Sequence, residues 1–234
     1  MKISIIVPAA GCGARANLSV NKILAPIHGK PLIWWTLRAL LQPEAMPEGA
    51  FLCEVIIAGR QDELEVLRSS AHPTSTPLLF VVGGADRQGS VANAAAAAQG
   101  ELLMVHDAAR PLVSAGLIQR VCRAAILGGA AIAALPAADT VKVARAEGPG
   151  HLVAATLERK TVWLAQTPQA FRRELLMSAL RQAELDGFQG TDCASMVERL
   201  PGENGRVALV EGEPRNIKVT YPEDLTRAAM ILGP

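Results

Sequence analysis

Short apolar segments alternate with longer segments of helical character along the first 136 residues of the chain. Continuous apolar strands that alternate with helices are typical of a parallel sheet with helices on both faces. We therefore predict an α/β fold, Rossmann-like, with a doubly wound and mostly parallel sheet. The expected strands are 3–7, 53–58, 78–82, 101–106 and 130–136, and the expected helices lie near 31–41, 61–70, 88–99 and 114–127.

The pattern changes after Pro136. Residues 138–158 form two alternating segments around the turn 146–150, which predicts a hairpin whose loop is longer than two residues. We expect it to project from the domain as an arm. No repeat or low-complexity linker divides the chain, so we expect a single domain over residues 1–234. The remaining expected elements are helices at 172–186 and 192–199, a strand at 206–210, and a last helix from Pro222, where proline suits the first turn.

The composition argues against nucleic acid or a membrane as a partner. The chain has 23 lysines and arginines against 22 acidic residues, so no global field attracts a polyanion. Aromatic residues make up 3% of the chain, too few for the stacking platforms that bind single-stranded nucleic acid. Any phosphate binding must therefore come from locally clustered cations.

The cysteines and apolar runs indicate a cytoplasmic protein. The four cysteines, at positions 12, 53, 122 and 193, form no C-x-x-C motif, and we expect buried small hydrophobes in a reducing compartment. The first apolar run is interrupted by Ser4, stopped by Pro8 and shorter than export signals normally are. The longest uncharged stretch, 124–138, is too short to span a membrane.

The sequence VPAAGCGARA at 7–16 is a glycine-rich loop directly after the first expected strand. Gly11, Gly13 and Ala16 fit the spacing of a dinucleotide-binding loop. They equally fit a loop that wraps a nucleoside triphosphate, or a turn that needs glycine only for its backbone angles. The dinucleotide alternative is weakened because three residues separate the strand from the first glycine, and because 36–42 contains no acid to bind a ribose.

Two cations, Arg15 and Lys22, follow the glycines. Cations on a loop suit a triphosphate, whose charge exceeds what backbone N–H groups alone can neutralise. In a parallel sheet, ligands bind beyond the carboxyl ends of the strands. We therefore expect the site just after Val7, Val82, His106 and Pro136, with the segments 7–16, 83–90 and 106–111 on one edge.

His106 and Asp107 stand at the end of the fourth expected strand. There, the Asp107 carboxylate can hold Mg²⁺ against phosphates, and Arg110 can pair with a second anion. The alternative is that Asp107 caps the next helix, although Ser114 is the better cap candidate. His106 has no partner histidine at metal spacing, so we expect it to have a structural, hydrogen-bonding role.

Seven segments of the chain occur together in order: VPAAGCGAR (7–15), Lys22, GGADRQGSV (83–91), VHDAARP (105–111), TPQAF (167–171), TD-x-AS (191–195) and NIKVTYPEDL (216–225). This combination closely resembles the 2-C-methyl-D-erythritol 4-phosphate cytidylyltransferase family of the non-mevalonate isoprenoid pathway, over nearly the whole chain. The resemblance implies a nucleotidyltransferase fold and a homodimer with a β-arm, which agrees with the hairpin at 138–158. The implied reaction is attack of a methylerythritol phosphate oxygen on the α-phosphorus of CTP, with Mg-pyrophosphate leaving.

The resemblance also implies a role for each matched residue. Arg15 and Lys22 would be the catalytic cations that stabilise the crowded α-phosphoryl group, and Asp107 would hold Mg²⁺. The nucleotide would be bound by Ala9, Ala10, Gly11, Gly13, Gly84, Ala85 and Ser90. The methylerythritol phosphate would be positioned by Arg159 and Lys218, with Thr140, Thr167 and Arg110 in support.

The chain departs from the family pattern at four positions. Ala16 stands where methionine is usual, and Arg215 where an acid is common. Asn21 and Ile23 flank Lys22 in place of proline and glutamine. We expect the loop around Lys22 to be less pre-shaped as a result.

Two other functions stay open. A cytidylyltransferase that acts on ribitol 5-phosphate shares the glycine loop and the TPQ-x-F segment, but tends to carry valine where Ala109 stands. A nucleotide-binding regulatory protein without turnover is the other alternative. Such a protein would have little need for Arg15, Lys22, Asp107, Arg159 and Lys218 together.

Overall fold

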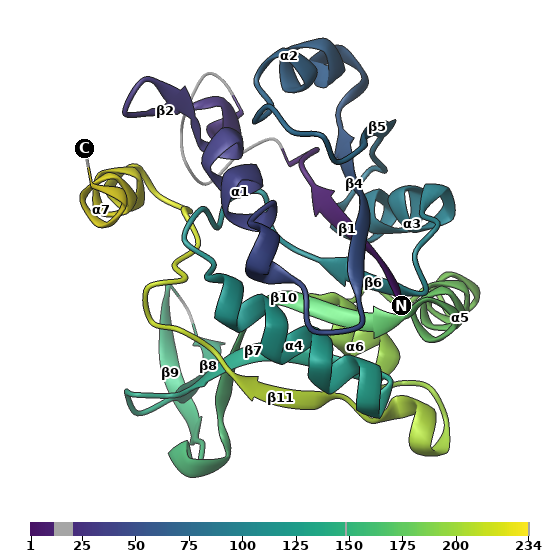
Figure 1. Ribbon diagram of the computed structural model, residues 1–234. Coiled ribbons are helices and arrows are strands. Elements are labelled where there is room, and N and C mark those ends of the chain that lie inside the picture. Colours follow the sequence, from purple (N-terminus) through teal and green to yellow (C-terminus); the bar gives the residue numbers. More distant parts are fainter. Residues whose placement is uncertain (12–20, 148, 234) are drawn as a thin grey trace.

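A seven-stranded sheet forms the centre of the molecule in the computed structural model, which describes residues 1–11, 21–147 and 149–233 (Figure 1). Its strands are β1 (Lys2–Pro8), β4 (Phe51–Gly59), β5 (Leu78–Val82), β6 (Leu102–Val105), β7 (Ala130–Pro136), β10 (Trp163–Arg172) and β11 (Ala208–Glu211). The order across the sheet is β11-β7-β10-β6-β1-β4-β5. Every pairing is parallel except those of β10, which runs antiparallel to both β6 and β7. The predicted α/β class with a mostly parallel sheet is confirmed.

The sequence does not predict strand β10, although it lies inside the sheet. Its middle, Gln166–Gln169, is polar apart from Pro168, so it does not read as a continuous apolar run. The pairing with β7 shifts register between Ala165 and Gln169, which leaves Pro168 outside the regular ladder. Proline is tolerated within a sheet at such an irregularity. Hydrogen bonds from neighbouring segments satisfy the buried side chains of this stretch.

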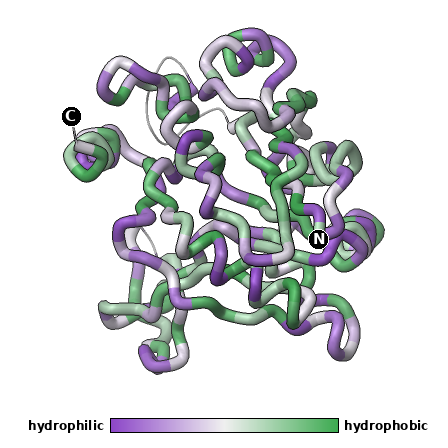
Figure 2. The backbone as a smooth tube through the Cα atoms, viewed as in Figure 1, coloured by the Kyte–Doolittle hydropathy of each residue, from purple (hydrophilic) through white to green (hydrophobic). Residues whose placement is uncertain are grey.

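Helices cover both faces of the sheet (Figure 1). One face packs against α1 (Leu32–Leu40), α4 (Ala115–Gly128) and α7 (Pro222–Leu232), and the other against α3 (Arg87–Ala97), α5 (Arg173–Leu185) and α6 (Cys193–Val197). In β1, Ile5 and Val7 belong to the first core and Ile6 to the second, as the alternation of a strand requires. Figure 2 shows hydrophobic residues along the central strands and hydrophilic ones at the outer loops.

The predicted helices are confirmed with one change. Helix α4 begins where expected, because the Ser114 hydroxyl accepts a hydrogen bond from Leu117 N at 3.0 Å and caps it. The expected helix at 61–70 is instead a 3₁₀ turn, η4 (Gln61–Glu63), followed by the short α2 (Leu64–Ser69). The Glu63 carboxylate is directed to Asn21 and does not cap that helix. The other short elements are η2 (Lys22–Leu24), β2 (Pro26–Ile27), β3 (Lys30–Pro31), η3 (Pro43–Ala45), η5 (Arg159–Thr161) and η6 (Gly202–Gly205).

The arm between β7 and β10 is a separate two-stranded sheet, β8 (Lys142–Glu147) and β9 (Gly150–Thr156). Figure 1 shows it projecting from the lower edge of the molecule. All described residues of both strands are exposed, including Val143, Leu152 and Val153. The register pairs Glu147 with Gly150, so the connection has two residues and our expectation of a longer loop is wrong. An antiparallel pair can close through so short a connection.

Two further expectations concern the cysteines and the membrane. Cys122 and Cys193 are buried, Cys53 is half-buried, and all three are free thiols; Cys12 lies outside the described residues. Burial raises the pKa of the Cys122 thiol to about 12. Across the described ranges, no helix is both long enough and apolar enough to cross a membrane.

Candidate active site

A cavity of about 430 Å³ opens at the carboxyl edge of the sheet, past the ends of β1 and β6 and beside the start of α3. The segments after β1, β5 and β6 meet there, as the sequence predicts, and Lys218 joins them from the segment before α7. The residues that directly follow β7 are not among the described residues of the cavity wall, so that part of the expectation is wrong. The wall is formed by Pro8, Ala9, Ala10, Gly11, Asn21, Lys22, Ile23, Gly84, Ala85, Asp86, Arg87, Ser90, Asp107, Ala108, Ala109 and Lys218.

The loop between β5 and α3 is folded tightly on itself. The Asp86 carboxylate accepts from Gly89 N at 2.7 Å and caps α3, while Gly84 N donates to Ser90 Oγ at 3.1 Å. Ser90 Oγ donates in turn to the Asp86 carbonyl at 2.8 Å. A Cβ on Gly84 would stand 2.6 Å from the Gly89 backbone. The small residues therefore let one wall of the cavity consist of backbone.

Gly84→Ala is expected to lower the affinity for a nucleotide and to destabilise the fold by about 1–3 kcal/mol, because the added methyl group forces the two backbones apart. Urea unfolding and nucleotide titration calorimetry measure the two effects. Gly116→Ala is the matched control, since its Cβ would meet its nearest neighbour, Arg120 Nη1, at an ordinary 3.6 Å. Equal behaviour of the two variants would contradict the prediction.

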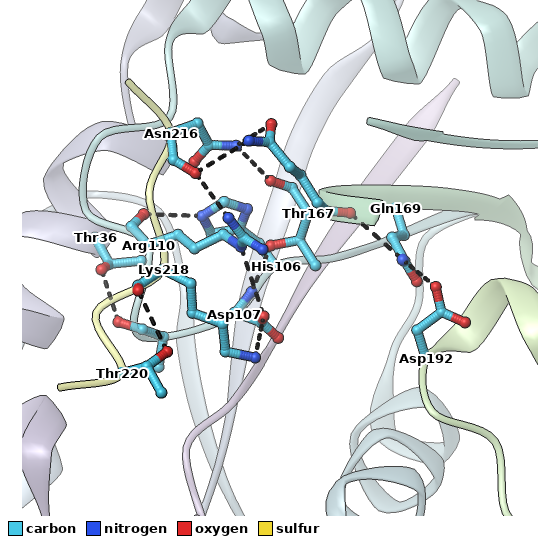
Figure 3. Close-up of polar contacts among 12 residues, drawn as sticks. Thr36, His106, Asp107, Arg110, Thr167, Gln169, Asp192, Asn216, Lys218 and Thr220 are labelled. Carbon is cyan, nitrogen blue, oxygen red and sulfur yellow. Dashed lines mark hydrogen bonds and ion pairs between the residues drawn. The ribbon is translucent and has the colours of Figure 1, made fainter. Parts of the chain in front are cut away.

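Among the described residues, three cations form ion pairs with Asp107. Two of them, Arg110 and Lys218, are labelled beside it in Figure 3. Lys218 Nζ lies 2.8 Å from Asp107 Oδ2, and Arg87 donates to Oδ1 from both Nε and Nη2 at 3.2 Å. Arg110 Nε lies 3.7 Å from Oδ2. The backbone N–H of Asp107 donates to Thr167 Oγ1 at 3.0 Å, which fixes the strand end to β10. The carboxylate is thus held by groups from α3, the segment before α7, and its own turn.

This surrounding charge decides the protonation of Asp107. Burial by itself would raise the pKa of the carboxyl group, but Arg87, Lys218 and Arg110 outweigh it and hold the pKa well below its ordinary value. The neighbouring His106 is fully buried, and burial lowers its pKa to about 4, so it is neutral near pH 7. Its Nε2 donates to the Arg110 carbonyl at 3.0 Å, in keeping with the hydrogen-bonding role expected for it.

Asp107→Asn is expected to lower the free energy of unfolding of the metal-free protein by about 2–4 kcal/mol at pH 7, because three partly buried cations lose their counter-charge. A carboxyl whose folded pKa is depressed stabilises the fold above its unfolded pKa, near 3.8. That stabilisation is lost as the pH falls below this value toward the lower folded pKa. The gap between wild type and variant should therefore be constant from pH 7 to 5 and shrink below pH 4.

Urea unfolding at several pH values, with a chelator present, measures this gap. Asp62→Asn removes the exposed ion pair between Asp62 and Arg60, which lie 2.7 Å apart, and should cost at most about 1 kcal/mol. A gap for Asp107→Asn as small as that of the control would show that its ion pairs add nothing to stability.

Two residues of this network carry no signal that sequence reasoning used. Arg87 lies inside the segment 83–91, but within that segment the resemblance implies a role only for Gly84, Ala85 and Ser90. Asn216 is fully buried and donates from Nδ2 to the Thr167 carbonyl at 2.8 Å, while its own carbonyl accepts from Arg110 Nη1 at 2.7 Å. The first bond fastens the segment that carries Lys218 to β10, and the second fastens it to the turn that follows β6.

The structure gathers most, but not all, of the residues expected in the site. Arg110 and Thr167 are buried behind Asp107 and do not line the cavity. Thr140 and Arg159 are exposed at the base of the arm, where Arg159 Nη1 donates to the Ala138 carbonyl at 3.1 Å, and neither lines the cavity of its own chain. Gly13 and Arg15, and with them Ala16, lie outside the described residues. The expected residues that line the cavity are Ala9, Ala10, Gly11, Lys22, Gly84, Ala85, Ser90, Asp107 and Lys218.

The donor set of the cavity fits a divalent cation only together with a substrate. Among the described residues, no group of three or more His, Cys, Asp or Glu side chains could hold a metal. Mg²⁺ at nucleotide sites is usually held by one or two carboxylates and by substrate phosphates. Asp107 fits the part of the single protein carboxylate, because Asp86 already caps α3 and accepts a bond from Gln189.

The fold and the site define a class. A mostly parallel α/β sheet with a cavity at its carboxyl edge, lined by small residues, lysines and one ion-paired carboxylate, is the arrangement of a nucleotide-binding α/β protein. A profile of the 2-C-methyl-D-erythritol 4-phosphate cytidylyltransferase family matches residues 3–234. The chain belongs to this family.

Individual relatives agree with the family match. A 2-C-methyl-D-erythritol 4-phosphate cytidylyltransferase from Bacillus licheniformis is 39% identical, over 99% of this chain and 96% of the relative. One from Shouchella clausii is 41% identical, over 99% and 97%. The crystal structure of the enzyme of that name from Thermus thermophilus superimposes with a TM-score of 0.77 at 35% identity, and covers 99% of this chain and 98% of that one.

Proposed function

We propose that this protein transfers the cytidylyl group of CTP to 2-C-methyl-D-erythritol 4-phosphate, giving 4-diphosphocytidyl-2-C-methyl-D-erythritol and pyrophosphate. A phosphate oxygen of the polyol attacks the α-phosphorus of CTP, and the bond from that phosphorus to the bridging oxygen of the leaving pyrophosphate breaks. No covalent intermediate with the protein is needed. The observation that carries the proposal is the cavity that brings Lys22, Asp107 and Lys218 together in a chain matched end to end by the cytidylyltransferase family.

The chain's own groups contribute position and charge. Lys22, together with Arg15, stabilises the negative charge that crowds the α-phosphoryl group as it becomes five-coordinate. Lys218 leaves the Asp107 carboxylate to bind the polyol phosphate, and Arg87 keeps that carboxylate oriented when Lys218 moves. A divalent cation, Mg²⁺ in this proposal, would be held by Asp107 and would neutralise the triphosphate.

Selection of the base rests on the close walls of the cavity. Ala9 and Ala10 follow β1, and Gly84 and Ala85 follow β5, so backbone donors and acceptors from two strand ends face the space for the nucleotide. A purine would clash there, and uracil would present reversed hydrogen-bonding groups and leave buried partners unpaired. A comparable kcat/KM for CTP and ATP would exclude this account.

We also propose that the arm serves a homodimer. Its two strands are exposed throughout and present Val143, Leu152 and Val153 to solvent. An isolated hairpin is marginal in water, so a partner subunit that covers it would stabilise it. Arg159 and Thr140 at its base would then act in the partner's site.

A cytoplasmic location is also part of the proposal, since Cys53, Cys122 and Cys193 are free thiols.

The deciding experiment is pyrophosphate release with CTP and either 2-C-methyl-D-erythritol 4-phosphate or ribitol 5-phosphate. Turnover with the first and none with the second is expected. Turnover with ribitol 5-phosphate alone would assign the chain to the other cytidylyltransferase activity. CTP binding without pyrophosphate release in the presence of either polyol phosphate would favour the regulatory alternative.

A further inference from the structure

The side chain of Asn21 is buried at the point where the chain enters the cavity wall, immediately before Lys22. Its amide makes three hydrogen bonds. Nδ2 donates to the Ala9 carbonyl at 3.2 Å and to Glu63 Oε2 at 2.8 Å, and Oδ1 accepts from Ile23 N at 3.3 Å. Asn21 thereby contacts the end of β1, the turn η4 and the turn η2 at once.

The partners fix the orientation of this amide. If its oxygen and nitrogen were exchanged, the nitrogen would face the Ile23 N–H, donor to donor. The oxygen would face the Ala9 carbonyl and the Glu63 carboxylate, acceptor to acceptor. Both N–H groups and one lone pair of the amide are therefore used, and no other residue type of this size offers two donors and an acceptor.

These bonds attach the backbone of Lys22 to the sheet. Ala9 N donates to the Ala58 carbonyl at 2.7 Å, so the Ala9 carbonyl belongs to a segment held by β1 and β4. On the other side, Asn21 caps η2, whose turn is closed by Leu24 N to the Asn21 carbonyl at 2.9 Å and Ala25 N to the Lys22 carbonyl at 3.1 Å. We expected the loop around Lys22 to be less pre-shaped without proline. From Asn21 to Ala25, however, the segment is held by the hydrogen bonds of the Asn21 amide and by the two backbone bonds of η2.

We propose that Asn21 is a positioning residue for Lys22, with Glu63 as its anchor. The amide holds the start of η2 against the end of β1, so that the Lys22 ammonium is presented to the cavity at a fixed height above the sheet edge. The inference rests on the proposed catalytic role of Lys22. A cation that acts on a reacting phosphoryl group loses much of its effect when it is misplaced by about 1 Å, on the order of a hundredfold in rate.

Asn21→Asp keeps the hydrogen-bond acceptor of this side chain and removes its donors. The introduced carboxylate can still accept from Ile23 N, but it cannot donate to the Ala9 carbonyl and it repels the Glu63 carboxylate. We expect kcat for pyrophosphate release to fall about tenfold to a hundredfold while the KM for CTP changes less than about threefold. Adding Glu63→Gln to Asn21→Asp should restore a large part of kcat, because the glutamine amide donates to the new carboxylate.

A second measurement does not depend on turnover. In Asn21→Asp, amide hydrogen exchange at Leu24 and Ala25 should accelerate about tenfold, and it should slow again in the double variant, while the amides of β6 stay unchanged. Glu65→Gln is the matched control, since Glu65 is exposed close to Glu63 in the chain and pairs only loosely with Arg68 at 3.7 Å. It should leave kcat and exchange at their wild-type values.

The outcomes separate this inference from the proposed function. A wild type that turns over, with Asn21→Asp within about twofold of it in kcat, would overturn the inference alone. So would a double variant that stays as slow as Asn21→Asp. A wild type that releases no pyrophosphate would refute the proposed function, and unchanged exchange at Leu24 and Ala25 would refute the anchoring by Asn21 whatever the activity.

Discussion

Replacement of Lys22 by alanine is expected to lower kcat by about 10²–10³-fold while the KM for CTP changes little. Lys22 lines the cavity on η2, whose capping residue Asn21 is hydrogen-bonded to the Ala9 carbonyl just past β1. In the proposed reaction it acts on charge that develops at the α-phosphoryl group, and loss of one such donor costs about 2.7–4 kcal/mol of transition-state stabilisation. Removing an interaction made only in the transition state lowers kcat and kcat/KM together.

Steady-state pyrophosphate release, with CTP varied at saturating polyol phosphate, measures both parameters. Lys30→Ala is the control, because Lys30 is an exposed lysine on β3 that does not line the cavity. Its Nζ lies 5.8 Å from the centroid of the Trp34 ring. The kcat of this variant should equal that of the wild type. If Lys22→Ala instead raised KM with kcat unchanged, Lys22 would bind CTP equally in the ground state and the transition state.

The fold is predictable from the sequence where hydrophobicity and secondary structure coincide. Strands β1, β4 and β7 are mostly apolar, as strands covered on both faces of a sheet must be. Strand β10 escapes that rule because its central residues are polar. Gln169 donates to Asp192 at 2.8 Å and accepts from Cys193 N at 3.1 Å, which ties the strand to α6 instead of adding to a core. Such side-chain hydrogen bonds leave no periodic pattern in the sequence from which the strand could be predicted.

The candidate site is predictable to the extent that topology gathers it. The rule that ligands bind past the carboxyl ends of parallel strands brings Ala9, Gly84 and Asp107 to one edge, and the structure places them there. Long side chains obey no such rule. Arg87 extends from the first turn of α3 to Asp107, and Asn21 is fixed by a carboxylate 42 positions further along the chain. Their roles depend on tertiary distances that spacing does not encode.

The base of the arm lies apart from the cavity of its own chain. The resemblance groups Arg159 and Thr140 with Lys218, but of these three only Lys218 lines the cavity. A second subunit resolves the difference if its arm brings these residues to the neighbouring cavity. The arm is then a part of the active site that each chain supplies to its partner.

Co-refolding of Lys22→Ala with Arg159→Ala is expected to recover about a quarter of wild-type activity from two parents that are each nearly inactive. In a two-fold symmetric dimer whose sites combine one body with the other subunit's arm, each mixed dimer has one site with both defects and one with neither. Random pairing makes about half of the dimers mixed, and each of these has one working site of two.

Arg159 is exposed and donates to a nearby carbonyl, so its replacement should leave the fold intact. Pyrophosphate release by the mixture, compared with each parent after the same refolding, gives the recovered fraction, and mass spectrometry of differently labelled chains confirms the exchange. A fully exchanged mixture that stays as inactive as its parents would place the action of Arg159 within its own chain.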